Sequence, residues 1–373
     1  MGGDATRERR REELLVNGQR NKLRGYEELI CDWSASPEVD GPAANPAPPR
    51  RSGKMRAMTT RRQHYVWQKY LEPWTVKKGK AHQLWCLRRG ATTPICTETK
   101  NVGVERDFYR LVDLQEGDID FVRNIAFGPK TNPKLRELNE GWISQFDLFL
   151  RLRRAAKEHP KASEALLKAL DQQMIEYQEN AYSRMETGAV EHIAALGTGD
   201  VSFFEDTNQA VEFSYFLAHQ YFRTKAIRNR IRDTFPERAH KDRFHRTWPI
   251  FRYIFATNIG YSIFADRKRF KLQVLSAAPN MEFITGDQPA VNTYGAFVPP
   301  NTPLDELELY YPVSPTRAVI LSDHSIYRHG MTLEPFRMAY LNQIIELIAY
   351  EQLFAQSEES LKSIVSLFIG APR

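Results

Sequence analysis

The chain has 373 residues, of which 42% are hydrophobic and 12% aromatic, so it is able to bury a large core. This length and composition predict a globular protein with about two domains, or with one large domain and appendages. The formal net charge of +6 and the pI near 9.1 are only mildly basic. Where the charges lie therefore matters more than their sum.

Cysteine usage and hydropathy exclude several classes of protein. Cys31, Cys86 and Cys96 form no Cys-x-x-Cys pair, which argues for a reducing compartment and against a disulfide framework or a cysteine-ligated zinc. The most apolar long stretch, residues 249–265, contains Arg252 and is too short to span a membrane. The charged N-terminus has no apolar signal core. We therefore expect a cytoplasmic protein that does not enter a membrane.

Residues 1–58 differ in composition from the rest of the chain. Residues 7–28 are highly charged and predict an exposed amphipathic helix, and residues 41–49 form a Pro/Ala linker that cannot hold regular structure. We expect residues 1–58 to be a disordered or partly helical extension, and residues 59–373 to form a single α+β domain.

The domain begins with a segment, residues 62–74, that is unusually dense in aromatic and polar side chains. Val66, Tyr70 and Leu71 recur at helical spacing and predict a buried helical turn. His64 stands near the start of this turn, where backbone donors and ring nitrogens can converge on a ligand.

The remaining elements follow from periodicity and from turn residues. Short strands that would form an antiparallel ribbon are predicted at 83–87, 94–96 and 107–111. Helices are predicted at 118–156, 163–196, 207–234 and 249–265. Strands return at 270–275, 282–285, 308–312 and 318–322, and helices follow at 334–356 and 358–368. This order predicts an α+β fold, mainly helical, with a small and mostly antiparallel sheet built from N-terminal and C-terminal strands.

The segment that contains His64 also carries a family resemblance. His64, Val66, Tyr70 and Leu71 match the His-x-Val-Pro-x-x-Tyr-Leu pattern of the uncharacterised domain of unknown function (DUF) 4238 family, with a tryptophan in place of the proline. Further similar motifs are Gln220–Thr224, Phe283–Pro289, Tyr311–Pro315 and Asn342. The chain resembles this family from about residue 60 to residue 358, and the resemblance implies no established mechanism.

His64 and Asp287 are the candidate catalytic residues. An imidazole titrates near neutral pH and can pass a proton in either direction. The alternative for His64 is a core histidine whose ring bonds to a backbone carbonyl. Asp287 follows a predicted strand, and Gly286 would let the backbone turn sharply and point the carboxylate into a cleft. The alternative for Asp287 is an ordinary turn in which it caps its own backbone.

Gln220, Arg223, Thr224 and Asn342 are the candidate substrate-binding residues. The first three lie at i, i+3 and i+4, so they project from one side of a predicted helix. A glutamine on an apolar face belongs either to a buried polar network or to a pocket wall. Arg223 is suited to bind a phosphate or carboxylate, or to form an internal bridge to Asp287 or a glutamate. Asn342 interrupts an apolar helix and should bond across to another element, with ligand contact as the alternative.

Positive charge is concentrated in one segment, residues 223–252, which holds ten Lys or Arg against three Asp or Glu, a net of +7. Such a segment favours a polyanionic partner, most commonly nucleic acid. We expect four of its basic residues to lie in a loop, namely Arg238, Lys241, Arg243 and Arg246.

Metal and cofactor signatures are absent from the sequence. There is no Walker A loop, no Gly-x-Gly-x-x-Gly, no His-Glu-x-x-His and no Gly-x-Ser-x-Gly. His240, Asp242 and His245 suggest a metal site, but their basic surroundings would repel a cation. We assign them to a solvated or phosphate-facing surface.

Two functional hypotheses follow. In the first, the protein is an intracellular hydrolase, a nuclease or other phosphodiesterase, with His64 as general acid or base and Asp287 orienting it or holding a metal. Gln220 and Arg223 would then stabilise the developing phosphate charge. In the second, the protein is a noncatalytic nucleic-acid-binding or regulatory module whose polar motif residues hold the fold. Neither hypothesis fixes a cofactor or an oligomeric state.

Overall fold

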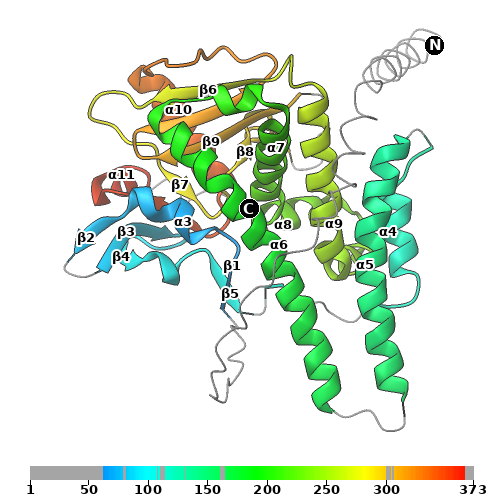
Figure 1. Cartoon of the computed structure of the whole chain (residues 1–373). Coiled ribbons are helices and arrows are strands. Elements are labelled where there is room, and N and C mark those ends of the chain that lie inside the picture. The colour runs from blue at the N-terminus through cyan, green and yellow to red at the C-terminus, as the bar shows by residue number, and fades with distance from the viewer. Residues whose placement is uncertain are drawn as a thin grey trace, which may run out of the picture. The chain divides into compact units, whose positions relative to one another are not determined.

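The computed structural model describes residues 62–78, 81–106, 108–109, 114–129, 131–159, 164–299, 304 and 306–365. The expectations for the extension at 1–58, for most of the strand at 107–111 and for the end of the helix at 358–368 lie outside these residues. Residues 61–373 belong to one compact unit. Its fold is a mainly helical α+β mixture with antiparallel sheets, which confirms the predicted class (Figure 1).

A five-stranded antiparallel sheet joins both ends of this unit, as predicted. Its strands are β2 (Val76–Lys78), β3 (Ala81–Arg88), β4 (Ile95–Glu98), β7 (Thr285–Gly286) and β11 (Gln352–Ala355). The order is β2-β3-β11-β7, and β4 also pairs with β3. Strand β11 therefore lies between strands that are far away in sequence.

A second sheet is built from the C-terminal half alone, so the prediction of a single small sheet was incomplete. Its order is β6 (Lys271–Ser276), β10 (Arg317–Ser322), β9 (Glu308–Ser314) and β8 (Val291–Asn292). A separate two-stranded ribbon pairs β1 (Arg62–His64) with β5 (Val104–Arg106).

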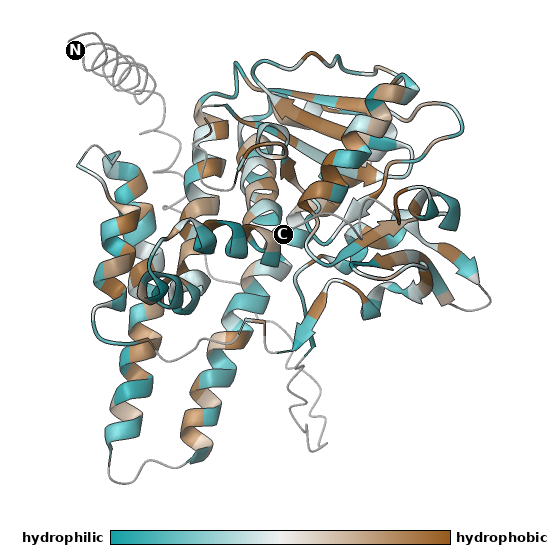
Figure 2. Cartoon of the chain, turned by 180° about the vertical axis from the view of Figure 1, so that it is seen from behind, coloured by the Kyte–Doolittle hydropathy of each residue, from teal (hydrophilic) through white to brown (hydrophobic). Residues whose placement is uncertain are grey.

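Helices cover both faces of the four-stranded sheet. Alternate residues of a strand point to opposite faces. Leu309 and Tyr311 of β9 share a core with α6 (Glu164–Thr198) and α7 (Thr207–Phe222), whereas Tyr310 shares one with α10 (Pro335–Ile348). Figure 1 shows α6 crossing this sheet, and Figure 2 shows its strands coloured as hydrophobic. The sheet is thus buried on both sides.

An aromatic core beside the sheets is formed with α4 (Asp118–Ala126), α5 (Pro133–Glu158), α8 (Lys225–Thr234) and α9 (Arg238–Ala265). The short C-terminal α11 (Glu358–Lys362) packs against β3 and β11 instead. The single helix predicted at 118–156 is interrupted before Pro133, where Asn132 caps the new helix through bonds to two backbone amides. The helix predicted at 207–234 is interrupted at Arg223, and Thr224 caps α8. No helix among the described residues is long and apolar enough to cross a membrane.

Three further expectations were wrong in whole or in part. The predicted buried helical turn is present as α3 (Gln68–Leu71) and the 3-10 turn at Glu72–Trp74, but residues 62–64 form a strand that pairs with β5. After this strand, the Tyr65 and Val66 amides donate to the Gly103 carbonyl. The helix predicted at 334–356 ends at Ile348, and its last residues form β11.

The third wrong expectation was the loop for Arg238, Lys241, Arg243 and Arg246, which all lie in α9. Phe244, Trp248 and Phe251 recur at i, i+4 and i+7 on this helix and are buried. This apolar face favours the helix despite the charged residues around it.

Gly103 provides a test of how β1 is held. Its φ is +57°, and a Cβ atom there would lie 2.6 Å from the Val66 Cβ. We predict that Gly103→Ala lowers the free energy of unfolding, measured by urea denaturation, by at least about 2 kcal/mol. Gly188→Ala is the control, because Gly188 lies in α6 with open space around it and alanine favours helices by about 1 kcal/mol. Equal effects of the two substitutions would contradict this account.

Candidate functional site

Arg223 is the centre of the buried polar region. It lies between α7 and α8 and is only 2% exposed. Its Nη1 contacts Glu186 Oε1 on α6 at 2.6 Å, and its Nη2 donates to the His64 carbonyl at 2.9 Å and to the Tyr109 hydroxyl at 3.1 Å. The guanidinium carbon also lies 4.5 Å from the centroid of the Tyr182 ring. Of the two alternatives for Arg223, the structure has the internal bridge, with Glu186 as the partner.

His64 contributes its carbonyl to this network, while its ring faces elsewhere. The carbonyl accepts from Arg223 and also from the Tyr109 hydroxyl, at 2.9 Å. The ring Nδ1 is 3.2 Å from the Gln68 Nε2, and the ring Nε2 is buried without a hydrogen-bond partner. Burial lowers the pKa of His64, and the Lys100 carbonyl opposes this shift. The ring is therefore neutral at neutral pH.

Asp287 closes the turn between α10 and β11. Its two carboxylate oxygens accept from the Tyr350 and Glu351 amides, each at 2.7 Å, and its own amide donates to the Gln352 carbonyl at 3.0 Å. Burial raises the pKa of Asp287 to about 6, and the two amides oppose this shift. Asp287 thus caps a distant turn, an arrangement that neither sequence alternative described. No hydrogen bond or ion pair joins it to His64 in the part of the chain that the structure describes.

The other candidate residues have separate surroundings. Thr224 hydrogen-bonds to the Gln288 side chain, and Gln220 is buried with no partner for its Oε1. Asn342 donates to the Glu282 carbonyl at 3.0 Å and accepts from the Ile284 amide at 3.1 Å. Asn342 therefore bonds across to another element, as the sequence suggested.

Lys225 connects the motifs, and the sequence analysis missed it. Its Nζ contacts Glu105 at 2.6 Å and Glu351 at 3.1 Å, and lies 5.2 Å from the centroid of the Tyr65 ring. The Tyr65 hydroxyl is buried without a partner. Burial raises the pKa of Tyr65, and the nearby Asp287 carboxylate adds to the shift. The only signal for Tyr65 and Lys225 was that each directly follows a motif residue.

A second buried cation, Arg252, lies in the same helical core. It hydrogen-bonds to Gln178, and its guanidinium carbon lies 4.7 Å from the Tyr109 ring centroid and 5.3 Å from that of Tyr253. It forms no ion pair with any described residue. The aromatic faces therefore stabilise a charge that lacks a carboxylate partner.

His219 lies beside both buried arginines. It is 1% exposed, and neither ring nitrogen has a hydrogen-bond partner. Burial lowers the pKa of His219 well below 6.5, and the charges of Arg223 and Arg252 add to this shift. His219 is thus held in its neutral form.

The family of the chain follows from its match to a family model. The model described as "Protein of unknown function (DUF4238)" matches residues 62–251, just over half of the chain. The chain belongs to this family. The matched region contains His64, Gln220, Arg223 and Thr224, whereas Asp287 and Asn342 lie beyond it. Searches of curated proteins and of solved structures found no match.

In the basic segment of this DUF4238 protein, four of the ten Lys or Arg residues pair with carboxylates from other elements. Glu186 pairs with Arg223, and Glu105 and Glu351 pair with Lys225. Asp118, which is fully buried, pairs with both Arg243 and Arg246. Adding these four acids to the three in the segment gives seven against ten Lys or Arg. The net charge of +7 in the sequence becomes +3 in the fold.

The remaining positive charge gathers on α8 and α9, which pack together. We call Arg228, Arg232, Arg238, Lys241 and His245 the α8–α9 basic face. Arg228 and Arg232 are one helical turn apart, and both lower the pKa of His245, after burial as the main cause. The three α9 residues follow one another at i, i+3 and i+7, on one side of that helix.

Arg228 is the unusual member of this face. Within the part of the chain that the structure describes, its guanidinium makes no ion pair, and it donates to the Asn229 side chain at 3.3 Å. Burial lowers the pKa of Arg228, and Arg232 and Arg252 add to this effect while Glu105 opposes it. The cation therefore lies in a partly desolvated place among other cations.

The sequence assigned His240, Asp242 and His245 to a solvated or phosphate-facing surface. His240 pairs with Glu237 at 3.4 Å and stacks on the Phe121 ring. Among the residues that the structure describes, no group of three or more His, Cys, Asp or Glu side chains is arranged to hold a metal ion.

We expect His219 to make the unfolding free energy of the helical core depend on pH. Its folded pKa is below that of the unfolded chain, so the unfolded state binds more protons as the pH falls below about 6.5. The stability linked to His219 is complete above that pH and is lost as the pH falls, by up to about 1.4 kcal/mol per pH unit. We predict that His219→Phe, which cannot be protonated, shows a smaller loss of unfolding free energy between about pH 7.5 and pH 5.

The comparison isolates His219 because the other titrating groups are present in both proteins. Asp287 titrates in the opposite sense, since its pKa is raised. Urea denaturation at each pH measures the difference. Identical pH slopes in the two proteins would contradict the buried neutral histidine.

Proposed function

We propose that this DUF4238 protein binds nucleic acid through its α8–α9 basic face, and that its polar motif residues hold the fold instead of carrying out chemistry. The observation that carries the proposal is Arg228, a partly buried guanidinium that has no carboxylate partner among the described residues. Burying a charge without a partner is costly, and a phosphate group would supply the missing counter-charge. A guanidinium matches phosphate geometry particularly well.

The motif residues make hydrogen bonds inside the fold, and this supports a structural role for them. Both oxygens of Asp287 accept from backbone amides, and both terminal nitrogens of Arg223 bond within the core. The amide of Asn342 bonds to two backbone groups of a neighbouring segment. Groups whose hydrogen bonds are already made inside the fold have little capacity left for a substrate.

A phosphodiesterase is the second candidate function. Its support is the His64 Nε2, which is buried and has no partner, together with the pKa of about 6 at Asp287, close to the range of a general acid or base. Under this hypothesis the protein cleaves the nucleic acid that it binds.

The salt dependence of binding tests the first proposal. If Arg228, Arg232, Arg238 and Lys241 each neutralise one phosphate of duplex DNA, the logarithm of affinity falls against the logarithm of salt with a slope of about 3.6. Replacing all four by Gln should bring the slope close to zero. Arg243 and Arg246 are left unchanged, because their loss would leave the buried Asp118 without the two cations that pair with it. Fluorescence anisotropy with a labelled duplex measures both slopes.

The matched control removes four exposed cations from other elements, Lys69, Lys77, Arg154 and Arg184, by the same change to Gln. It should keep the slope of the unchanged protein. The proposal is wrong if the protein binds no DNA at low salt, or if the salt slope of the control falls as much as that of the test variant. Cleavage of the DNA that His64→Gln abolishes would instead favour the phosphodiesterase.

A further inference from the structure

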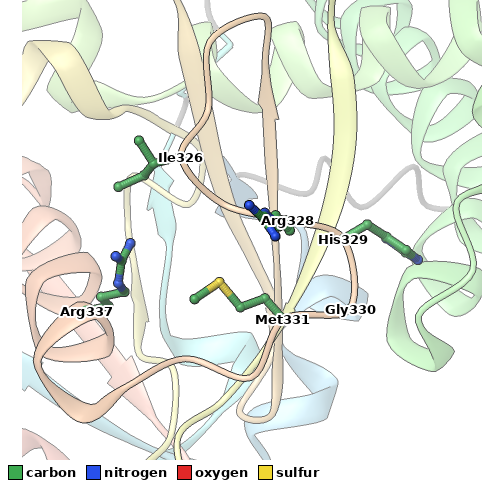
Figure 3. Close-up of a pocket in the computed structure, with 6 residues that line it drawn as sticks. All are labelled: Ile326, Arg328, His329, Gly330, Met331 and Arg337. Carbon is green, nitrogen blue, oxygen red and sulfur yellow. The ribbon is translucent and has the colours of Figure 1, made fainter.

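A pocket lies between α10 and the loop that joins β10 to α10, which hydrogen-bonds to the edge strand β6. It has a volume of about 540 Å³, within the size range of small-molecule sites, and is lined by Ile326, Arg328, His329, Gly330, Met331 and Arg337. None of these residues belongs to the family motifs or to the α8–α9 basic face. In Figure 3, Ile326, Arg328, Met331 and Arg337 surround one space, while the His329 ring extends away from the others.

The pocket wall is held firmly by backbone hydrogen bonds to β6, the edge strand of the sheet. The Gly330 amide donates to the Val274 carbonyl at 2.8 Å, the Ser276 amide donates to the Met331 carbonyl at 2.8 Å, and the Leu333 amide donates to the Ser276 carbonyl at 3.0 Å. Gly330 has a φ of +77°, which makes the turn. The loop thus covers the sheet edge and has a defined shape before any ligand binds.

Positive charge in the pocket is not neutralised. Neither Arg328 nor Arg337 forms an ion pair with a described residue, and no acidic residue is among those that line the space. Glu334, which precedes α10, pairs with neither arginine. The Arg337 guanidinium carbon lies 5.5 Å from the Phe336 ring centroid and 6.0 Å from that of Tyr327, so aromatic faces hold it in place.

The same pocket exposes apolar side chains. Ile326 is 72% exposed, and together with Met331 it lines the pocket beside the two guanidinium groups. A small molecule that carries an oxyanion and an apolar part would satisfy both features.

We propose that this pocket binds a small organic oxyanion, a phosphate ester or a carboxylate with an apolar group attached. The oxyanion lies between Arg328 and Arg337, and the apolar group covers Ile326 and Met331. This site is separate from the α8–α9 basic face, and it does not depend on nucleic-acid binding.

The test uses phenyl phosphate, phenylacetate and inorganic phosphate as probes, with binding to the full-length protein measured by isothermal titration calorimetry. We expect phenyl phosphate or phenylacetate to bind more tightly than inorganic phosphate, and the better of the two identifies the oxyanion. The double variant Arg328→Gln and Arg337→Gln should weaken binding of the better probe by at least about tenfold, since even one charge-assisted hydrogen bond contributes about that factor. Ile326→Ser should reduce the difference in affinity between the better aromatic probe and inorganic phosphate.

The matched control is Arg154→Gln with Arg184→Gln, which removes the same charge from exposed positions on α5 and α6. It should bind all three probes as the unchanged protein does, and thermal melting checks that each variant is folded. The proposal is wrong if no probe binds at millimolar concentration, if the control loses as much affinity as the pocket variant, or if inorganic phosphate binds as tightly as the aromatic probes.

Discussion

The buried ion pair between Arg223 and Glu186 is the interaction on which the rest of the domain depends. Through Arg223 it joins the interruption between α7 and α8 to α6, to the Tyr109 hydroxyl and to the carbonyl of His64 at the end of β1. A buried cation must be matched by nearby acceptors, and here three come from separate parts of the chain. The requirement fixes where β1 meets the helical core, and it places Tyr65 beside Lys225.

The helical core around Arg223 is rich in cations. Arg223 has a carboxylate, but among the described residues Arg252 contacts the Gln178 side chain and the faces of tyrosine rings without an ion pair. His219 stays neutral beside them, because a third charge in the same place would be repelled. The same segment that looks like a nucleic-acid-binding sequence is therefore partly an internal scaffold. The surface of this segment that can bind a partner is the smaller α8–α9 basic face.

The sequence predicted those features that depend on local pattern. Helical periodicity identified α6 and the buried part of α9, and Asn342 bonds across to another element because a polar side chain in an apolar helix must do so. Strand β11 was missed because its residues continue the apolar pattern of α10. What makes them a strand is their pairing with β3 and β7, which are far away in sequence.

In the candidate site, too, contacts between distant parts of the chain could not be predicted from local pattern. His64 and Arg223 are in contact, but the contact runs through a backbone carbonyl, and no side-chain pattern encodes that. Glu186 gave no signal, since it is one of many glutamates on a long polar helix. The partners of Asp287 are the backbone amides of Tyr350 and Glu351, which any residue type could supply. Long-range partners of these kinds follow from the fold and not from spacing.

The most direct test of the central claim is the unfolding free energy of Glu186→Gln, measured by urea denaturation at neutral pH. Removing the carboxylate leaves Arg223 buried without a counter-charge, so we expect a loss of about 3 to 5 kcal/mol. Glu191→Gln, an exposed position on the same helix, should stay within about 0.5 kcal/mol of the unchanged protein. If Glu186→Gln is as stable as Glu191→Gln, the ion pair does not hold the domain together, and the account is wrong.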